Sequence, residues 1–193
     1  MEIGMIISSI LLGVGLAMDA FSVSLANGLN EADMKKWRMV TISGVFSLFQ
    51  LAMPLLGWIC VATVANYFAL FEKAIPWIAL VLLTYIGAKM LYGGIKGGQE
   101  GEKTAVLSWG ELLLQGVATS IDALSVGFTI ADYVFEEALI ACLIIGAVTF
   151  IICLVGIIIG KKAGTALAGK AGILGGVILI FIGIEIFVSN IFM

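Results

Sequence analysis

The chain contains no histidine, and only 12% of its 193 residues are charged. Without histidine it cannot form zinc sites of the histidine type, histidine proton relays, or the Ser-His and Cys-His pairs of nucleophilic catalysis. Soluble domains carry about a quarter charged residues, and one of this length could not bury an apolar content of 62%. A lipid bilayer can accommodate it. The sequence therefore predicts an integral membrane protein.

Cysteine is scarce as well. The three cysteines, Cys60, Cys142 and Cys153, all lie in apolar runs and form no C-x-x-C pair. Free cysteine commonly behaves as a small buried hydrophobe, so we expect three free thiols rather than a metal or redox site. The net charge of −3 identifies no partner, because the position of the charges matters more than their sum. The expected surroundings are a lipid bilayer, and we expect no nucleic-acid partner.

The apolar residues are grouped into runs of spanning length. A membrane-spanning helix needs roughly 20 mostly apolar residues. Six segments meet this requirement: about Ile3–Leu29, Met39–Val64, Ile75–Tyr92, Leu107–Ala131, Leu139–Gly160 and Ile173–Phe192. The first run is too long for a signal peptide and lacks a basic leading region, so we interpret it as a span. The sequence thus predicts an all-α integral membrane protein with six transmembrane helices.

The basic residues are distributed asymmetrically between the loops. Eight of the ten lie in the loops between spans 1 and 2, 3 and 4, and 5 and 6: Lys35, Lys36, Arg38, Lys96, Lys103, Lys161, Lys162 and Lys170. Only Lys73 lies on the opposite side, and Lys89 is inside a span. Since cytoplasmic loops carry the excess of Lys and Arg, these three loops should face the cytoplasm. Both termini are then expected outside.

The two halves of the chain resemble each other. The stretch "MDAFSVSL" is echoed by "SIDALSVGF", so that Asp19 matches Asp122 at a separation of 103 residues, and Gly57 matches Gly160 at the same separation. We divide the chain into a first three-helix repeat, a cytoplasmic linker and a second three-helix repeat, at residues 1–95, 96–106 and 107–193. Because each repeat has an odd number of spans, the halves should be inverted relative to each other. Inverted repeats with a site at their interface are typical of secondary transporters.

Each copy of the repeat places an aspartate in the middle of an apolar span. A carboxylate in hydrocarbon costs at least a few kcal/mol, so intramembrane charges normally face a cavity or a partner. Residues i and i+3 share a helix face, so Asp19 with Ser22, and Asp122 with Ser125, each present a carboxylate and a hydroxyl. Two such faces, brought together near the bilayer midplane, would supply the oxygen ligands of a hard divalent cation such as Mn²⁺ or Mg²⁺.

The same pair provides a route to metal/proton exchange. Two carboxylates that meet repel each other, so one should take up a proton in the metal-free state, and metal entry would expel it. The alternative is that each aspartate only bonds hydroxyls or backbone groups between helices. The duplication of the aspartate at related positions argues against this alternative.

Further polar residues inside the spans are candidates for accessory or pathway roles: Asn27, Gln50, Gln115, Lys89 and Glu185. Gln115 lies two turns before the second aspartate and Gln50 is in the middle of span 2, so either is a candidate oxygen ligand. Hydrogen bonding between helices is an equal alternative for both. Asn27 is expected to line an inner vestibule or to end a helix. Lys89 and Glu185 either pair with each other or leave Lys89 to neutralise an aspartate after the metal departs.

The segments "GLAMDAFSVSLANGL", "FQLAMPLLGW", "GVATSIDALSVG" and "KAGILGGVILIFIG" resemble the bacterial manganese efflux pump family of the MntP type, within the lysine-exporter-like transporter superfamily. The resemblance covers nearly the whole chain. It implies a six-span exporter of the bacterial inner membrane that lowers cytoplasmic Mn²⁺ and needs no cofactor, with Asp19 and Asp122 as the functional aspartates. Many members carry glutamate where this chain has Gln50, Gly93 and Gly172, a difference that bears on ion selectivity or coupling.

Proteins of two other classes also carry aspartates inside membrane spans or lack a transport site altogether. An intramembrane aspartyl protease also uses one aspartate on each of two spans, but its Y-D and G-x-G-D motifs do not surround these aspartates. A non-transporting membrane scaffold should tolerate loss of both. On the same fold, an exporter of another divalent cation or of a small solute is the nearer alternative. The sequence is compatible with a homodimer and does not specify one.

Overall fold

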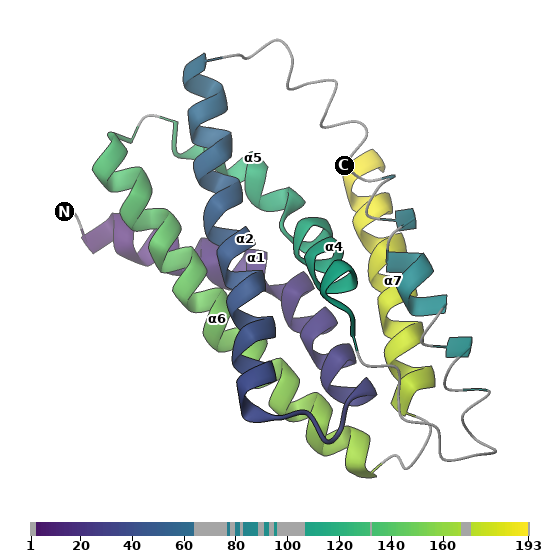
Figure 1. The fold of residues 1–193 in the computed structure, drawn as a ribbon. Coiled ribbons are helices and arrows are strands. Elements are labelled where there is room, and N and C mark those ends of the chain that lie inside the picture. The colour runs from purple at the N-terminus through teal and green to yellow at the C-terminus, as the bar shows by residue number, and fades with distance from the viewer. Residues whose placement is uncertain are drawn as a thin grey trace.

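The computed structural model of the chain describes residues 3–63, 77, 80, 81, 83–88, 91, 92, 95, 107–131, 133–166 and 171–192. Within these residues every regular element is a helix (Figure 1). The helices are α1 (Ile3–Asn30), α2 (Lys36–Thr63), α4 (Trp109–Thr119), α5 (Ile121–Thr129), α6 (Phe135–Ala166) and α7 (Ala171–Phe192). The predicted linker at residues 96–106 lies outside the described residues, and so does Lys89. The third predicted span is described only in part.

The ends of the helices differ from the apolar runs in the sequence. α2 begins at Lys36 and α6 at Phe135, each about one turn before the predicted span. Backbone hydrogen bonding does not require apolar side chains, so a helix continues past the hydrocarbon into its polar flank. The fourth predicted span differs more, because two helices, α4 and α5, take the place of one.

Three of the described segments are long and apolar enough to cross a membrane: Ile3–Asn30, Lys36–Cys60 and Phe135–Gly164. Large apolar side chains are exposed on each of them, including Leu11 at 66%, Leu48 at 62% and Ile151 at 62%. Extended apolar surface of this kind is rare on soluble monomers, whereas lipid tails solvate it. The structure is that of a helical membrane protein.

Among the described helices, α1 and α6 share the most extensive contact, and they run side by side in the same direction (Figure 1). Gly13 lies against Ile145 near the start of both helices, and Gly160 lies against the backbone carbonyl of Leu25 near their ends. A Cβ atom at Gly160 would overlap that carbonyl oxygen, so only glycine allows this approach. Small residues at such crossings let membrane helices pack backbone to backbone.

α2 contacts α6 in the opposite direction. The Ser47 hydroxyl donates to the Gly146 carbonyl at 2.8 Å. Farther along α2, the ring of Trp58 lies 5.9 Å from that of Phe135, at the first turn of α6.

The three cysteines are free thiols, as the sequence predicted.

α2 also packs against α4 and α5, and here the helices run in the same direction. Gly116 of α4 lies against the ring of Phe49, and Gly57 lies against the backbone carbonyl of Leu124 in α5. A Cβ atom at Gly57 would overlap that oxygen. Two parallel pairs, α1 with α6 and α2 with α4 and α5, therefore flank the antiparallel contact of α2 with α6, and the hydrophobic core lies between them.

Candidate functional site

Asp19 lies in the interior of α1, far from both ends of the helix. It is half-buried, and its neighbours Ala17 and Ala20 are fully buried. Leu16, one turn earlier, packs in an apolar cluster with Ala123, the residue that follows Asp122. The two repeated aspartates are thus attached to backbone segments that share one patch of packed apolar side chains.

Asp122 comes directly after an interruption of the fourth predicted span. α4 ends at Thr119, and α5 begins after Ser120, whose φ of −114° and ψ of 7° are not helical. The Thr119 hydroxyl donates to the carbonyl of Gln115 at 2.9 Å, and the Ser120 hydroxyl donates to that of Gly116 at 2.7 Å. Ser and Thr hydroxyls that bond to backbone in this way compete with the helical ladder. We therefore assign the break in the helix to the adjacent Thr119 and Ser120.

The interruption places a carboxylate at the junction of two helix ends. The Asp122 carboxylate accepts a hydrogen bond from the Ala123 N–H at 2.8 Å, in the first turn of α5. The carboxyl end of α4, where the helix dipole is negative, lies at the same junction. Broken helices in membrane transporters use such ends and their free carbonyls to hold ions.

Asp19 and Asp122 lie close enough for the charge of one carboxylate to act on the other. They come from α1 and α5, two helices from different halves of the chain. Among the described residues, no three His, Cys, Asp or Glu side chains lie close enough together to hold a metal ion by themselves. A cation held by the two carboxylates would therefore complete its shell with neutral oxygens.

The two serines predicted beside the aspartates are placed differently from each other. The Ser22 hydroxyl donates to the Met18 carbonyl at 3.0 Å within α1, which leaves its oxygen lone pairs free to face a ligand. Ser125 is exposed on the surface of α5. The structure thus does not place the two hydroxyls in equivalent surroundings.

Gln50 connects α2 to α1 beside Asp19. Its side-chain amide is buried and donates to the backbone carbonyl of Leu16 at 2.7 Å. Pro54, inside α2, has no N–H, so the backbone carbonyl of Gln50 loses its usual helical donor. Gln50 therefore adds both a side-chain amide and a backbone carbonyl at the depth of Leu16.

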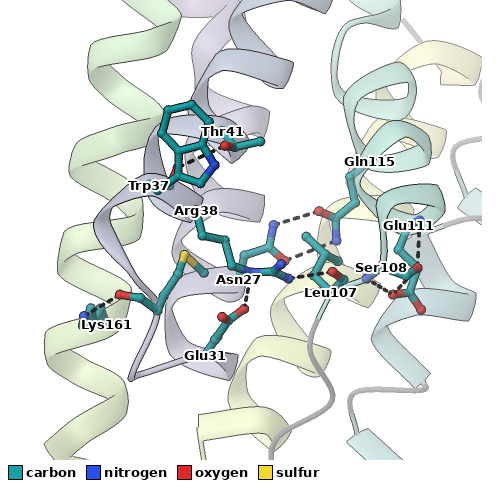
Figure 2. Close-up of polar contacts among 11 residues, drawn as sticks. Asn27, Glu31, Trp37, Arg38, Thr41, Leu107, Ser108, Glu111, Gln115 and Lys161 are labelled. Carbon is teal, nitrogen blue, oxygen red and sulfur yellow. Dashed lines mark hydrogen bonds and ion pairs between the residues drawn. The ribbon is translucent and has the colours of Figure 1, made fainter.

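Asn27 and Gln115 bond directly to each other. The Asn27 amide donates to the Gln115 side-chain oxygen at 2.8 Å, and the Gln115 amide donates back at 3.3 Å (Figure 2). Their exposed fractions are 3% and 0%. The pair joins α1 to α4 across 88 residues of sequence and closes the space between these helices.

A second set of polar contacts lies beyond this pair, at the end of the bundle that holds residues 31–35 (Figure 2). Arg38 of α2 donates to the Glu31 carboxylate at 2.7 Å and to the Leu107 carbonyl at 2.6 Å. It therefore ties the end of α1 to the segment that precedes α4. Lys161 of α6 donates to the Met34 carbonyl at 2.7 Å. The sequence identified these cations only by charge and gave no signal for their partners.

The same end of the bundle is hollow. A cavity of about 340 Å³ is lined by two acidic side chains, two basic side chains and the buried Ile42 and Leu112; the charged ones are Glu31, Asp33, Lys35 and Arg38. Its wall on α4 includes Ser108, which begins the helix with a capping box. Glu185 lies in α7, and the predicted pairing of Glu185 with Lys89 falls outside the described residues.

Comparison with known proteins gives one consistent family. A family model described as "Putative manganese efflux pump" matches residues 33–187. A relative from Clostridium botulinum strain Hall, named "Putative manganese efflux pump MntP 2", is 41% identical over 96% of this chain and 95% of its own length. Relatives named "Putative manganese efflux pump MntP" include one from Methanocorpusculum labreanum, 41% identical over 96% of this chain and 97% of its own. Another, from Methanobrevibacter smithii, is 41% identical over 94% of this chain and 96% of its own. No solved structure matches the chain.

Proposed function

Because the chain belongs to the MntP family of manganese efflux pumps, we propose that it exports Mn²⁺ from the cytoplasm through a site built around Asp19 and Asp122. The family is one of membrane transporters, so the protein is a multi-pass membrane transporter and not an enzyme. The intramembrane aspartyl protease considered from the sequence is thereby set aside.

The observation that carries the proposal is that two aspartates from separate spans lie beside one apolar cluster, which joins Leu16 of α1 to Ala123 of α5. Two carboxylates balance the charge of a divalent cation, and Mn²⁺ accepts carboxylate, carbonyl and amide oxygens. The backbone carbonyls at the helix break at Ser120 and the Gln50 carbonyl freed by Pro54 are the neutral oxygens that we assign to such an ion.

The packing of the helices supports two inverted three-helix repeats, at residues 1–95 and 107–193, with six spans in all. The repeat symmetry replaces span 1 (α1) by span 4 (α4 and α5), and span 5 (α6) by span 2 (α2). Applied to the contact of α1 with α6, it gives the observed contact of α4 and α5 with α2. The repeated glycines follow the same exchange, since Gly160 of α6 contacts α1 and Gly57 of α2 contacts α5. The aspartates then lie at the interface of the repeats, where transporters of this kind bind their substrate.

The orientation follows from the basic residues. The end of the bundle that carries residues 31–35 holds Lys35, Lys36 and Arg38, together with Lys161 of α6. By the positive-inside rule this end faces the cytoplasm and both termini lie outside. The cavity beside Arg38, which both acidic and basic side chains line, then opens on the cytoplasmic side, where an ion would first meet the protein.

Export is coupled to proton entry in this proposal. Two carboxylates that meet repel each other when no metal is bound, and a proton on one of them relieves the repulsion. Mn²⁺ that enters from the cytoplasm displaces this proton, and the pair takes up another from the outside after releasing the metal. Each cycle moves the metal outward and returns a proton inward.

Manganese efflux from cells that lack their own exporter tests the proposal. The parent chain should lower cell-associated Mn²⁺ after a manganese load, and Asp19→Asn and Asp122→Asn should not. Glu136→Gln is the matched control, because Glu136 is an exposed carboxylate in the first turn of α6, outside the cavity, and should leave efflux unchanged. The amount of each variant in the membrane is measured in the same cells.

The same cells distinguish the alternatives. Efflux by both aspartate variants at the parental rate would show that the aspartates are structural, and the proposed site would be wrong. A parent chain that leaves Mn²⁺ unchanged but lowers Mg²⁺ or another divalent cation would keep the site and change the substrate.

A further inference from the structure

The Asn27–Gln115 pair occupies the route between the cavity and the aspartates. On α1, Asn27 lies about two turns from Asp19, toward the end of the helix at Asn30. On α4, Gln115 lies on the corresponding side of Asp122, toward the start of the helix at Trp109. The pair thus crosses from α1 to α4 on one side of both carboxyl groups.

The cavity ends before it reaches the pair. Its inner wall includes Leu112, which lies one turn before Gln115 on α4. Leu112 and Ile42 are both buried, and the two amides beyond them are also buried. An ion in the cavity therefore meets packed apolar side chains and then a closed pair of hydrogen bonds.

We propose that Asn27 and Gln115 form the inner gate of the transport path, and that the Arg38 contacts to Glu31 and Leu107 hold this gate shut. The inference rests on the proposed function, because it assumes that the ion passes between spans 1 and 4. Separation of α4 from α1 breaks both amide bonds and opens the cavity toward Asp19 and Asp122.

The chemistry of the two amides suits a gate. Each side chain has one carbonyl oxygen, and in the closed state each oxygen accepts from the opposite amide. When the pair separates, the same oxygens can accept from the water around a cation or bind the cation itself. Because the amides are neutral, they bind the ion less strongly than the carboxylates do, so the ion can pass on to the carboxylates.

Labelling of a reporter cysteine tests the gate without requiring transport. Ser22→Cys, one turn from Asp19 on the side of Asn27, is introduced into a background with Cys60, Cys142 and Cys153 replaced by alanine. Inside-out membrane vesicles are treated with a membrane-impermeant cationic methanethiosulfonate, which reaches the protein from its cytoplasmic face. We expect slow labelling with the gate intact, and labelling about tenfold faster with Asn27→Ala plus Gln115→Ala.

Two further variants make the comparison specific. Ser47→Ala removes a hydrogen bond of similar length between α2 and α6, away from the route, and should leave the labelling rate unchanged. The exchange variant Asn27→Gln with Gln115→Asn retains an amide pair and should label as slowly as the parent. Equal rates for the intact and the double-alanine gate, or an equal increase with Ser47→Ala, would overturn the proposal.

A second measurement does not depend on the alanine variants folding. Asn27→Cys and Gln115→Cys in the same background are joined by a short bifunctional methanethiosulfonate. Manganese efflux should stop in the joined protein and return after reduction, and efflux at the unjoined rate would contradict the gate. If the chain does not export manganese at all, the proposed function fails, while the labelling rates still report the gate.

Discussion

The side-chain amide of Gln50 donates to the Leu16 carbonyl at 2.7 Å and thereby fixes α2 to α1 one turn before Asp19. A carbonyl inside an α-helix normally accepts only from the N–H four residues later, so this one receives a second donor. The bond joins span 2 of the first repeat to the segment that carries the first aspartate. Gln50 is therefore suited to position Asp19.

Loss of the bond between Gln50 and Leu16 should reduce the rate of Mn²⁺ transport at low Mn²⁺ concentration. For Gln50→Ala we expect the Mn²⁺ concentration at half-maximal uptake into inside-out vesicles to rise about 2–10-fold, since one net hydrogen bond is worth about 0.5–1.5 kcal/mol. Ser47→Ala, which removes a different bond of α2, should leave this concentration unchanged. An unchanged value for Gln50→Ala would assign the residue to packing alone.

The close contacts of Gly57 and Gly160 predict a sharp difference between glycine positions. A Cβ atom at either would overlap a backbone carbonyl, of Leu124 or Leu25, and a rigid helix cannot easily yield. We expect Gly57→Ala and Gly160→Ala to lower the midpoint of thermal unfolding in detergent, with a loss of about 1–3 kcal/mol as for other overpacked sites. Gly44→Ala is the control, because its Cβ atom would meet nothing within 4 Å. Equal midpoints for all three variants would contradict the packing described.

The start of α4 offers a smaller and more local test. The Ser108 hydroxyl accepts from the Glu111 N–H, and the Glu111 carboxylate accepts from the Ser108 N–H at 2.9 Å. Removing such a cap costs about 0.5–2 kcal/mol, so Ser108→Ala should lower the unfolding midpoint in detergent. Thr41→Ala removes only a bond from a hydroxyl to the carbonyl of Trp37 within α2, and should have little effect. A larger effect of Thr41→Ala would contradict the role given to the cap.

Much of the helical arrangement could be predicted from the sequence, and the reason is the bilayer. An apolar run of spanning length has few structures open to it, because backbone groups in hydrocarbon must bond within the segment. α1 was accordingly predicted from Ile3, where it begins. The break at Ser120 was not predicted, because the hydroxyls of Thr119 and Ser120 can bond the backbone in a continuous helix as well as in a broken one.

The polar partners were harder to predict than the aspartates. A repeat in the sequence identified Asp19 and Asp122, because duplication marks the same position twice. Nothing in a single chain specifies that Asn27 bonds to Gln115, since the choice depends on how far α4 is displaced along α1. The double role of Arg38 depends likewise on where the chain before α4 returns to the bundle.

Exchange of metal for a proton makes the most direct prediction about mechanism. In inside-out vesicles the medium takes the place of the cytoplasm, so export carries Mn²⁺ into the lumen and protons out of it. Added Mn²⁺ should therefore raise the pH of the lumen, which a trapped pH-sensitive dye reports. An acidic lumen should speed Mn²⁺ uptake, and a protonophore should abolish this advantage.

The aspartate variants separate this exchange from other ways of moving charge. Asp19→Asn and Asp122→Asn each remove one carboxylate of the proposed pair, so both the uptake of Mn²⁺ and the change in lumen pH should be lost. Glu136→Gln should retain both signals, because Glu136 is exposed in the first turn of α6, outside the cavity. Uptake of Mn²⁺ by the parent with no change in lumen pH would refute proton exchange while leaving the paired carboxylates as the metal site, since binding by two carboxylates does not itself require a proton as the returning ion.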